Sequence, residues 1–115
     1  MSELARVDVE PGEETCVVRV RGEVDISNAR RLLRQIENSL TNETPTLTVD
    51  LSGTTYLDSA GVQILFVLAE RLKDRRHRLR LVVPEGSPVR AVLELTGLEK
   101  MVRMETGPGG AEATG

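Results

Sequence analysis

The amino-acid sequence predicts an α/β fold, a single domain with a four- or five-stranded mixed sheet and helices in the order ββαβαβαβ. Along the chain, short segments in which apolar and polar residues alternate are followed by longer segments whose apolar residues recur at helical spacing. Helices connect the later strands, which implies parallel neighbours and right-handed crossovers. The length of 115 residues suits one domain that buries its own core.

The N-terminal part is predicted to form a hairpin and a helix. Residues 4–9 are a strand candidate, residues 11–14 read as a turn, and residues 15–21 follow a half-buried strand pattern before Gly22 interrupts the chain. A helix begins at Ser27 or Asn28, because either residue suits an N-cap. Its apolar stripe consists of Ala29, Leu32, Leu33, Ile36 and Leu40.

The rest of the chain is predicted to alternate strands and helices. A strand starting at residue 46 stops near residues 52–53, a loop covers residues 53–58, and a helix apolar on nearly every side covers residues 59–75. The next strand is residues 79–83. Pro88 suits the first turn of a third helix, and Gly97 suits its end. Residues 101–104 are an edge-strand candidate, and the small, polar residues 107–115 are predicted to be a disordered tail.

Composition excludes several classes of function. A single Cys and a single His exclude an internal disulfide and the usual zinc site. The net charge of -3 and an aromatic content of 2% argue against a nucleic-acid partner, because neither a basic field nor a stacking platform is expected. A signal peptide and a membrane-length apolar segment are not expected either, so the prediction is a soluble cytoplasmic protein without a membrane partner.

The segment of residues 50–65 is the candidate site, because sites in open α/β sheets gather at the carboxyl ends of strands. Asp58 or Ser59 suits the N-cap of the following helix. A phosphate on Ser59 would be stabilised by free N–H groups and the helix dipole, and would add nearly two negative charges. Gly61 would permit a close approach of the backbone. From the local sequence alone, a plain helix cap is the more common role for a serine at the position of Ser59.

Three stretches resemble the STAS-domain anti-sigma factor antagonists, which are bacterial partner-switching regulators. They are GEVD at residues 22–25, DLSG through LDSAG at residues 50–61, and the helix of residues 88–98. The resemblance spans roughly residues 5–105 in continuous order and spacing. It implies a STAS-type domain over residues 1–106, followed by the tail of residues 107–115.

The resemblance implies that Ser59 is a regulatory phosphoacceptor, with Asp58 orienting it and Asp25 beside the same surface. It further implies two partners, an anti-sigma factor that is also an ATP-dependent serine kinase and a phosphatase for the modified form. The antagonist itself would have no catalysis and no cofactor, and would be a monomer or weak dimer. The expected partner-binding residues are Asp25, Asp58, Ser59, Ala60, Gly61, Gln63 and Ile64.

Two other functions remain open. Many antagonists have Ser or Thr where this chain has Ala60, and an Ala-Gly pair such as Ala60-Gly61 is common in STAS accessory subunits of lipid-transport ATPases. That family commonly has Thr in the Ser59 slot. Some STAS domains are reported to bind nucleotides, although this chain has no phosphate loop.

Other residues have plainer interpretations. Asp50 is expected to be structural, and Cys16 to be part of the core. The basic run of residues 70–80 is expected to be a solvated helix end with His77 exposed, too far from Ser59 for a catalytic pair. The apolar residues 64–68 are expected to stay partly exposed as a docking surface.

Overall fold

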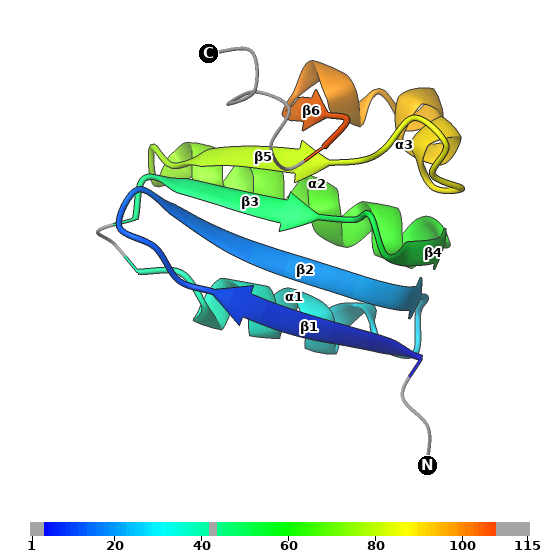
Figure 1. Cartoon of the computed structure of the whole chain (residues 1–115), viewed down its shortest axis with the longest axis horizontal. Coiled ribbons are helices and arrows are strands. Elements are labelled where there is room, and N and C mark those ends of the chain that lie inside the picture. Colours follow the sequence, from blue (N-terminus) through cyan, green and yellow to red (C-terminus); the bar gives the residue numbers. More distant parts are fainter. Residues whose placement is uncertain (1–3, 42–43, 108–115) are drawn as a thin grey trace.

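A computed structural model describes residues 4–41 and 44–107, and it confirms the α/β fold (Figure 1). Strands β1 (Ala5–Glu10) and β2 (Thr15–Val24) form an antiparallel hairpin. Strands β3 (Thr46–Asp50), β5 (Arg78–Val82) and β6 (Arg103–Glu105) continue the sheet in parallel. The strand order is β1-β2-β3-β5-β6, and β4 (Thr54–Leu57) pairs with the far end of β2.

The two longer helices, α1 (Ala29–Asn38) and α2 (Ser59–Asp74), lie side by side on one face of the sheet (Figure 1). Alternate strand residues point toward them and are buried, among them Cys16, Val18, Leu47, Val49 and Leu81. Helix α3 (Arg90–Thr96) and the 3-10 turn η1 (Leu98–Lys100) lead to β6 at the edge. Gly97 ends α3 in a left-handed conformation, as predicted.

The predicted loop of residues 53–58 is wrong in part, because residues 54–57 form β4. The reason is that β2 is longer than predicted: it does not stop at residue 21 but continues to Val24, past the end of β3. Gly22 makes this possible with a φ of 99° and a shift in register, where a side chain would meet the Leu4 carbonyl. Thr54 links β4 to β2 at this register shift, because its hydroxyl donates to the Val20 carbonyl at 2.8 Å.

The last elements also differ in detail from the prediction. The edge strand covers residues 103–105 and not 101–104, and η1 was not predicted. Of the tail expected over residues 107–115, all but Gly107 lies outside the described residues. Within the described residues, no helix is both long and apolar enough to cross a membrane.

The sheet face away from α1 and α2 holds ion pairs, and the most buried of them joins β5 to β6. Both oxygens of Glu105 accept from the Arg80 guanidinium, at 2.6 and 2.7 Å, and Arg103 lies 3.4 Å away. The hydrogen bonds from Arg80, aided by the charges of Arg80 and Arg103, lower the pKa of Glu105 although burial opposes the shift. The ionised carboxylate therefore stabilises the attachment of the edge strand.

Glu105→Gln should lower the free energy of unfolding by about 1 kcal/mol at pH 7. Because the folded pKa lies below the ordinary value of 4.5, the contribution is present above pH 4.5 and disappears as the pH falls through the folded pKa. Urea denaturation at pH 7 and at low pH measures both differences. Glu99→Gln is the control, since Glu99 is exposed. A loss that is equal at both pH values would contradict the interpretation.

Candidate functional site

The site lies where β2 and β4 end side by side. Val24 and Leu57 are partners in the parallel ladder, so the residues that follow them, Asp25 and Asp58, enter neighbouring loops. The Asp58 amide donates to the Val24 carbonyl at 3.2 Å and extends this pairing into the loops. The sheet thereby brings together two acidic residues that are 33 positions apart in the sequence.

The carboxylate of Asp58 joins the two loops. One oxygen accepts from the Gly61 amide at 3.0 Å and makes Asp58 the N-cap of α2. The other oxygen accepts from the Ile26 amide at 3.1 Å. Of the two cap candidates in the sequence, the structure therefore selects Asp58. It also assigns this residue a second contact, which holds the loop of residues 25–28 against the start of α2.

Asp25 organises its own loop, and within the described residues it makes no hydrogen bond to Ser59. Its carboxylate accepts from the amide and the hydroxyl of Ser27, and its backbone carbonyl accepts from the Ala29 amide at 2.8 Å. The buried Asn28 closes the loop, because its side chain accepts from the Asp25 amide and donates to the Glu23 carbonyl. Asn28 is the N-cap residue of α1, but its side chain makes no capping bond to that helix.

Ser59 is the first residue of α2 and its side chain is exposed. Among the described residues, its hydroxyl has no hydrogen-bond partner, because Asp58 fulfils the capping role. The hydroxyl is therefore accessible to solvent. It stands at the positive end of a 16-residue helix, where the dipole and the first backbone N–H groups favour a negative charge.

Gly61 is buried and faces the sheet, not the surface around Ser59. A Cβ there would lie 3.0 Å from Leu57 Cδ2 and 3.1 Å from both Val24 Cγ1 and the Val24 carbonyl oxygen. The glycine is needed because the first turn of α2 approaches β2 and β4 closely. In this structure Gly61 thus allows the start of α2 to pack closely on the ends of the two strands.

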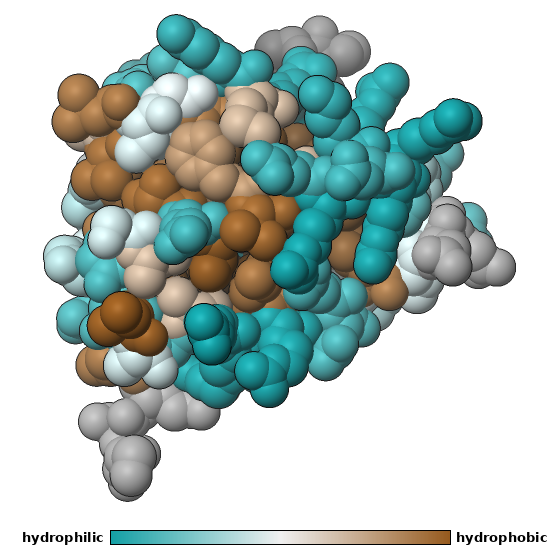
Figure 2. Space-filling model, turned by 180° about the vertical axis from the view of Figure 1, so that it is seen from behind, coloured by the Kyte–Doolittle hydropathy of each residue, from teal (hydrophilic) through white to brown (hydrophobic). Residues whose placement is uncertain are grey.

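The surface beside Ser59 is partly apolar, as predicted. Gln63 is exposed, and Ala60, Ile64, Phe66 and Val67 are half-buried. Leu65 and Leu68 are fully buried and belong to the core. Figure 2 shows apolar surface over the half of this face where α2 begins and hydrophilic side chains over the half where it ends.

Two exposed residues of the site were missed by the sequence reasoning. Ile26 is 83% exposed, although it is an aliphatic residue whose amide is held by Asp58. Tyr56, 50% exposed, lies on β4 opposite Glu23. A signal for Ile26 was present, since an isoleucine directly after Asp25 has no place in the apolar stripe of the following helix. Ile26 adds an exposed aliphatic side chain to the loop that Asp58 holds against the start of α2.

The plainer interpretations hold with one exception. Asp50 is buried and accepts from the Ser52 amide at 2.9 Å, with Arg19 at 3.9 Å, which confirms a structural role. Cys16 is buried in the core. His77 is not exposed as expected but half-buried, because the chain turns back from α2 into β5 at this point. Its Nδ1 is buried and has no partner among the described residues.

Asp58→Ala should lower the free energy of unfolding by about 1–2 kcal/mol, because both the helix cap and the bond to the Ile26 amide are lost. Asp58→Asn should lose less, since asparagine also caps helices. Urea denaturation measures the stabilities, and hydrogen exchange of the Ile26 amide reports the loop bond. If Asp58→Ala unfolds at the same urea concentration as the unaltered chain, the double role is wrong.

Comparison with known proteins matches the chain to a STAS family model and to an anti-sigma factor antagonist. The model described as "Mlab, STAS domain" matches residues 3–103. The anti-sigma-F factor antagonist RsfB of Mycobacterium tuberculosis is 30% identical over 89 residues, which is 76% of this chain and 70% of RsfB.

Solved structures agree with this match. An anti-sigma factor antagonist from Mycobacterium paratuberculosis superimposes with a TM-score of 0.83 at 29% identity, over 96% of this chain and 92% of that one. The unphosphorylated form of the anti-sigma factor antagonist SpoIIAA superimposes with a TM-score of 0.73 over 95% and 96% of the two chains. At 22% identity, this second likeness shows the shared fold.

Proposed function

The chain belongs to the STAS domain family, and from this premise we propose that it is an anti-sigma factor antagonist. The unmodified protein binds an anti-sigma factor and thereby releases the sigma factor for transcription. Two relatives that are anti-sigma factor antagonists support the proposal, at 30% and 29% identity over most of the chain. The observation that carries it is the exposed Ser59 at the start of α2, whose hydroxyl has no hydrogen-bond partner within residues 4–41 and 44–107, set in a partly apolar surface.

In this proposal the anti-sigma factor is also a serine kinase, and Ser59 is the residue that it phosphorylates. Docking would bring the apolar surface formed by Ile26, Ile64 and the neighbouring half-buried side chains against the partner. The kinase then reaches Ser59 without unfolding any part of the domain, because the hydroxyl is already exposed. A phosphatase removes the phosphate and restores the binding form.

Phosphorylation would end binding by electrostatics and desolvation. The phosphate adds nearly two negative charges next to the carboxylate of Asp58, which already occupies the N-cap. The dipole of α2 and its first N–H groups offset this charge within the domain, so the fold tolerates it. A docked partner would have to bury the phosphate in an apolar interface, and this cost favours dissociation.

The chain performs no catalysis of its own in this scheme. His77 follows the end of the 16-residue α2 whereas Ser59 begins it, and at about 1.5 Å per residue the helix holds them more than 20 Å apart. A serine–histidine pair is therefore not formed. We expect the protein to act in the cytoplasm, where transcription takes place, as a monomer or weak dimer.

The test is the release of a sigma factor in vitro. A preformed complex of the cognate sigma and anti-sigma factors is titrated with the unmodified protein, and sigma-dependent transcription is measured. Transcription should rise as the antagonist displaces the sigma factor. If transcription does not change, and the protein instead co-purifies with a subunit of a lipid-transport ATPase, the alternative accessory role is correct and the proposal is wrong.

A further inference from the structure

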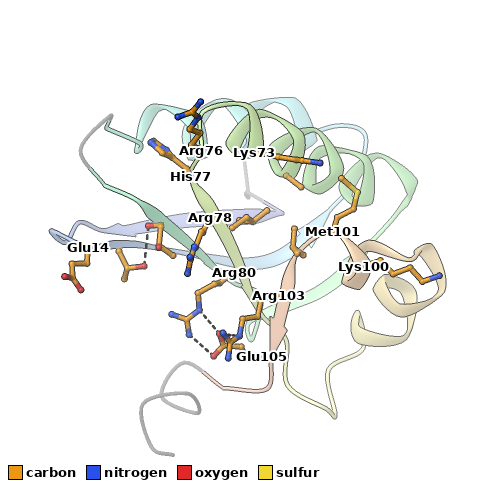
Figure 3. Close-up of a pocket in the computed structure, with 15 residues that line it drawn as sticks. Glu14, Lys73, Arg76, His77, Arg78, Arg80, Lys100, Met101, Arg103 and Glu105 are labelled. Atoms are coloured by element: carbon orange, nitrogen blue, oxygen red, sulfur yellow. Dashed lines mark hydrogen bonds and ion pairs between the residues drawn. The ribbon is translucent and has the colours of Figure 1, made fainter. Parts of the chain in front are cut away.

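Figure 1 places strand β1 at one edge of the sheet. All six of its residues pair with β2, and among the described residues no other strand pairs with it. The strand contains neither a proline nor a bulge, two features by which natural edge strands prevent further pairing. The opposite edge is different, because β6 has only three residues and its Glu105 is held by Arg80 (Figure 3). Strand β1 is therefore the edge to which another strand can be added.

The alternation of the β1–β2 hydrogen bonds identifies the backbone groups that are free. In an antiparallel pair, successive residues direct their N–H and C=O groups alternately toward the partner strand and away from it. The Glu23 amide donates to the Leu4 carbonyl at 2.8 Å, so Leu4 is turned toward β2. Every second residue after Leu4 is turned the same way. The residues turned toward the free edge are therefore Ala5, Val7 and Val9.

Two hydrogen bonds on the far side of β2 agree with this assignment. Gly22 is the partner of Ala5, and its amide donates away from β1, to a carbonyl of the turn after β3, at 2.9 Å. Val20 is the partner of Val7, and its carbonyl also points away from β1, where it accepts from the Thr54 hydroxyl at 2.8 Å. The backbone groups of Ala5 and Val7 thus do not bond to β2.

We propose that two copies of this chain form a dimer by antiparallel pairing of their β1 strands. With Val7 opposite Val7 of the second copy, Ala5 lies opposite Val9 on both sides of this pair, so every outward N–H and C=O group has a partner. These three residue pairs form about six backbone hydrogen bonds and join the two sheets into one. A symmetric dimer uses the same patch of both copies, and an edge strand paired with itself meets this condition.

The charges of β1 fit this pairing. Arg6 and Asp8 are exposed, on the sheet face away from the helices. In the proposed register, Arg6 lies opposite Asp8 of the second copy, and the two-fold axis repeats this contact, so two cross-strand pairs of opposite charge form. Within residues 4–41 and 44–107, Arg6 has no ion-pair partner, and Asp8 lies 3.9 Å from Arg21 of its own chain. Both charges are thus available to a second copy.

The neighbouring registers are less favourable. The pairing can shift only in steps of two residues, because free backbone groups occur on alternate residues. A shift in one direction places Arg6 opposite Arg6 of the second copy, and like charges directly opposite each other destabilise a sheet. A shift in the other direction places Asp8 opposite Asp8 and Ala5 opposite Pro11, which has no N–H group to donate. Of the three registers, only the proposed one has no like charges opposite each other.

The face of β1 toward the helices also supports the pairing. Val9 is 43% exposed, although its partner in β2, Val18, is fully buried. In the dimer, Val9 lies beside Ala5 of the second copy, which removes apolar surface from water. Six strand residues per copy are fewer than the roughly 20–30 of a standard interface, so the dimer is weak and depends on concentration.

Sedimentation equilibrium of the full chain, from micromolar to millimolar concentrations, measures the dimer, and circular dichroism checks that each variant is folded. Arg6→Asp alone and Asp8→Arg alone should each weaken the dimer by about tenfold or more, because two attractive pairs become repulsive. The combined variant restores the opposite charges and should regain the affinity of the unaltered chain. Lys100→Asp is the matched control, since it changes the net charge as Arg6→Asp does, at an exposed cation of η1, and should leave the dimer unchanged.

Cysteine variants test the register. Arg6→Cys and Asp8→Cys chains, mixed and mildly oxidised, should form disulfides between the two variants. The reason is that residues directly opposite in a non-hydrogen-bonded pair have Cα atoms about 4.5 Å apart, which a disulfide can bridge. Neither variant should cross-link by itself, and the native Cys16 is buried.

The proposal is wrong if the chain stays monomeric at millimolar concentration, or if the combined charge variant does not recover the dimer. A dimer that Arg6→Asp and Asp8→Arg leave unchanged would lie on another surface. Cross-linking of Arg6→Cys alone or of Asp8→Cys alone would show another register, and either finding overturns the proposal. These measurements need no anti-sigma factor, so their outcome does not depend on the proposed function.

Discussion

Ser59→Asp should weaken the affinity for the cognate anti-sigma factor by about 100-fold, whereas Ser59→Ala should leave it unchanged. The aspartate places a negative charge at the first residue of α2, next to the carboxylate of Asp58 and within the apolar surface that docks. The alanine keeps the surface uncharged and removes a hydroxyl with no partner among the described residues. Surface plasmon resonance with the immobilised anti-sigma factor measures both affinities.

Ser52→Asp is the matched control for this experiment. Ser52 is also exposed and also follows a strand of the sheet, but it lies in the turn after β3 and not on the docking surface. The affinity of the Ser52→Asp variant for the anti-sigma factor should equal that of the unaltered chain. If all three variants bind equally, the electrostatic switch is wrong. If Ser52→Asp loses as much as Ser59→Asp, the effect comes from net charge and not from the position of Ser59.

Ile26→Ala should weaken the same complex by about tenfold to 100-fold while the stability of the free protein stays within about 0.5 kcal/mol. An aliphatic side chain that is 83% exposed contributes little to the core, but it buries a large apolar area when a partner covers it. The loop position of Ile26 is fixed, because its backbone amide donates to the Asp58 carboxylate. This preorganisation lowers the entropy cost of docking.

Leu95→Ala is the control for Ile26→Ala. Leu95 is 87% exposed on α3, so both changes remove an aliphatic side chain of comparable exposure, but Leu95 lies outside the proposed docking surface. Affinity measurements should find no change for Leu95→Ala. Loss of affinity in both variants, or in Leu95→Ala alone, would place the docking surface elsewhere.

The sequence predicts most of the fold because its signals are local. Helical spacing marked α1 and α2, alternation marked β2 and β3, and Gly97 marked the end of α3. Strand β4 was not predicted, because its four residues do not alternate as a strand does. Its first and last residues are buried, and the two between them are exposed. Its identity depends on pairing with the distant end of β2, which no local pattern shows.

The site is predicted less completely for the same physical reason. Ser59 and Asp58 lie in one short segment, so a helix start was recognisable there. The contact of Asp58 with Ile26 joins residues 32 positions apart and depends on the β2–β4 register.

Mapping of phosphate after reaction with the partner tests the central claim most directly. The purified protein is incubated with its cognate anti-sigma factor and ATP, and the product is analysed by peptide mass spectrometry. The account predicts one phosphate, on Ser59, together with dissociation of the complex as it accumulates. Phosphate on another residue, no phosphate at all, or a complex that persists after Ser59 is fully modified would contradict it.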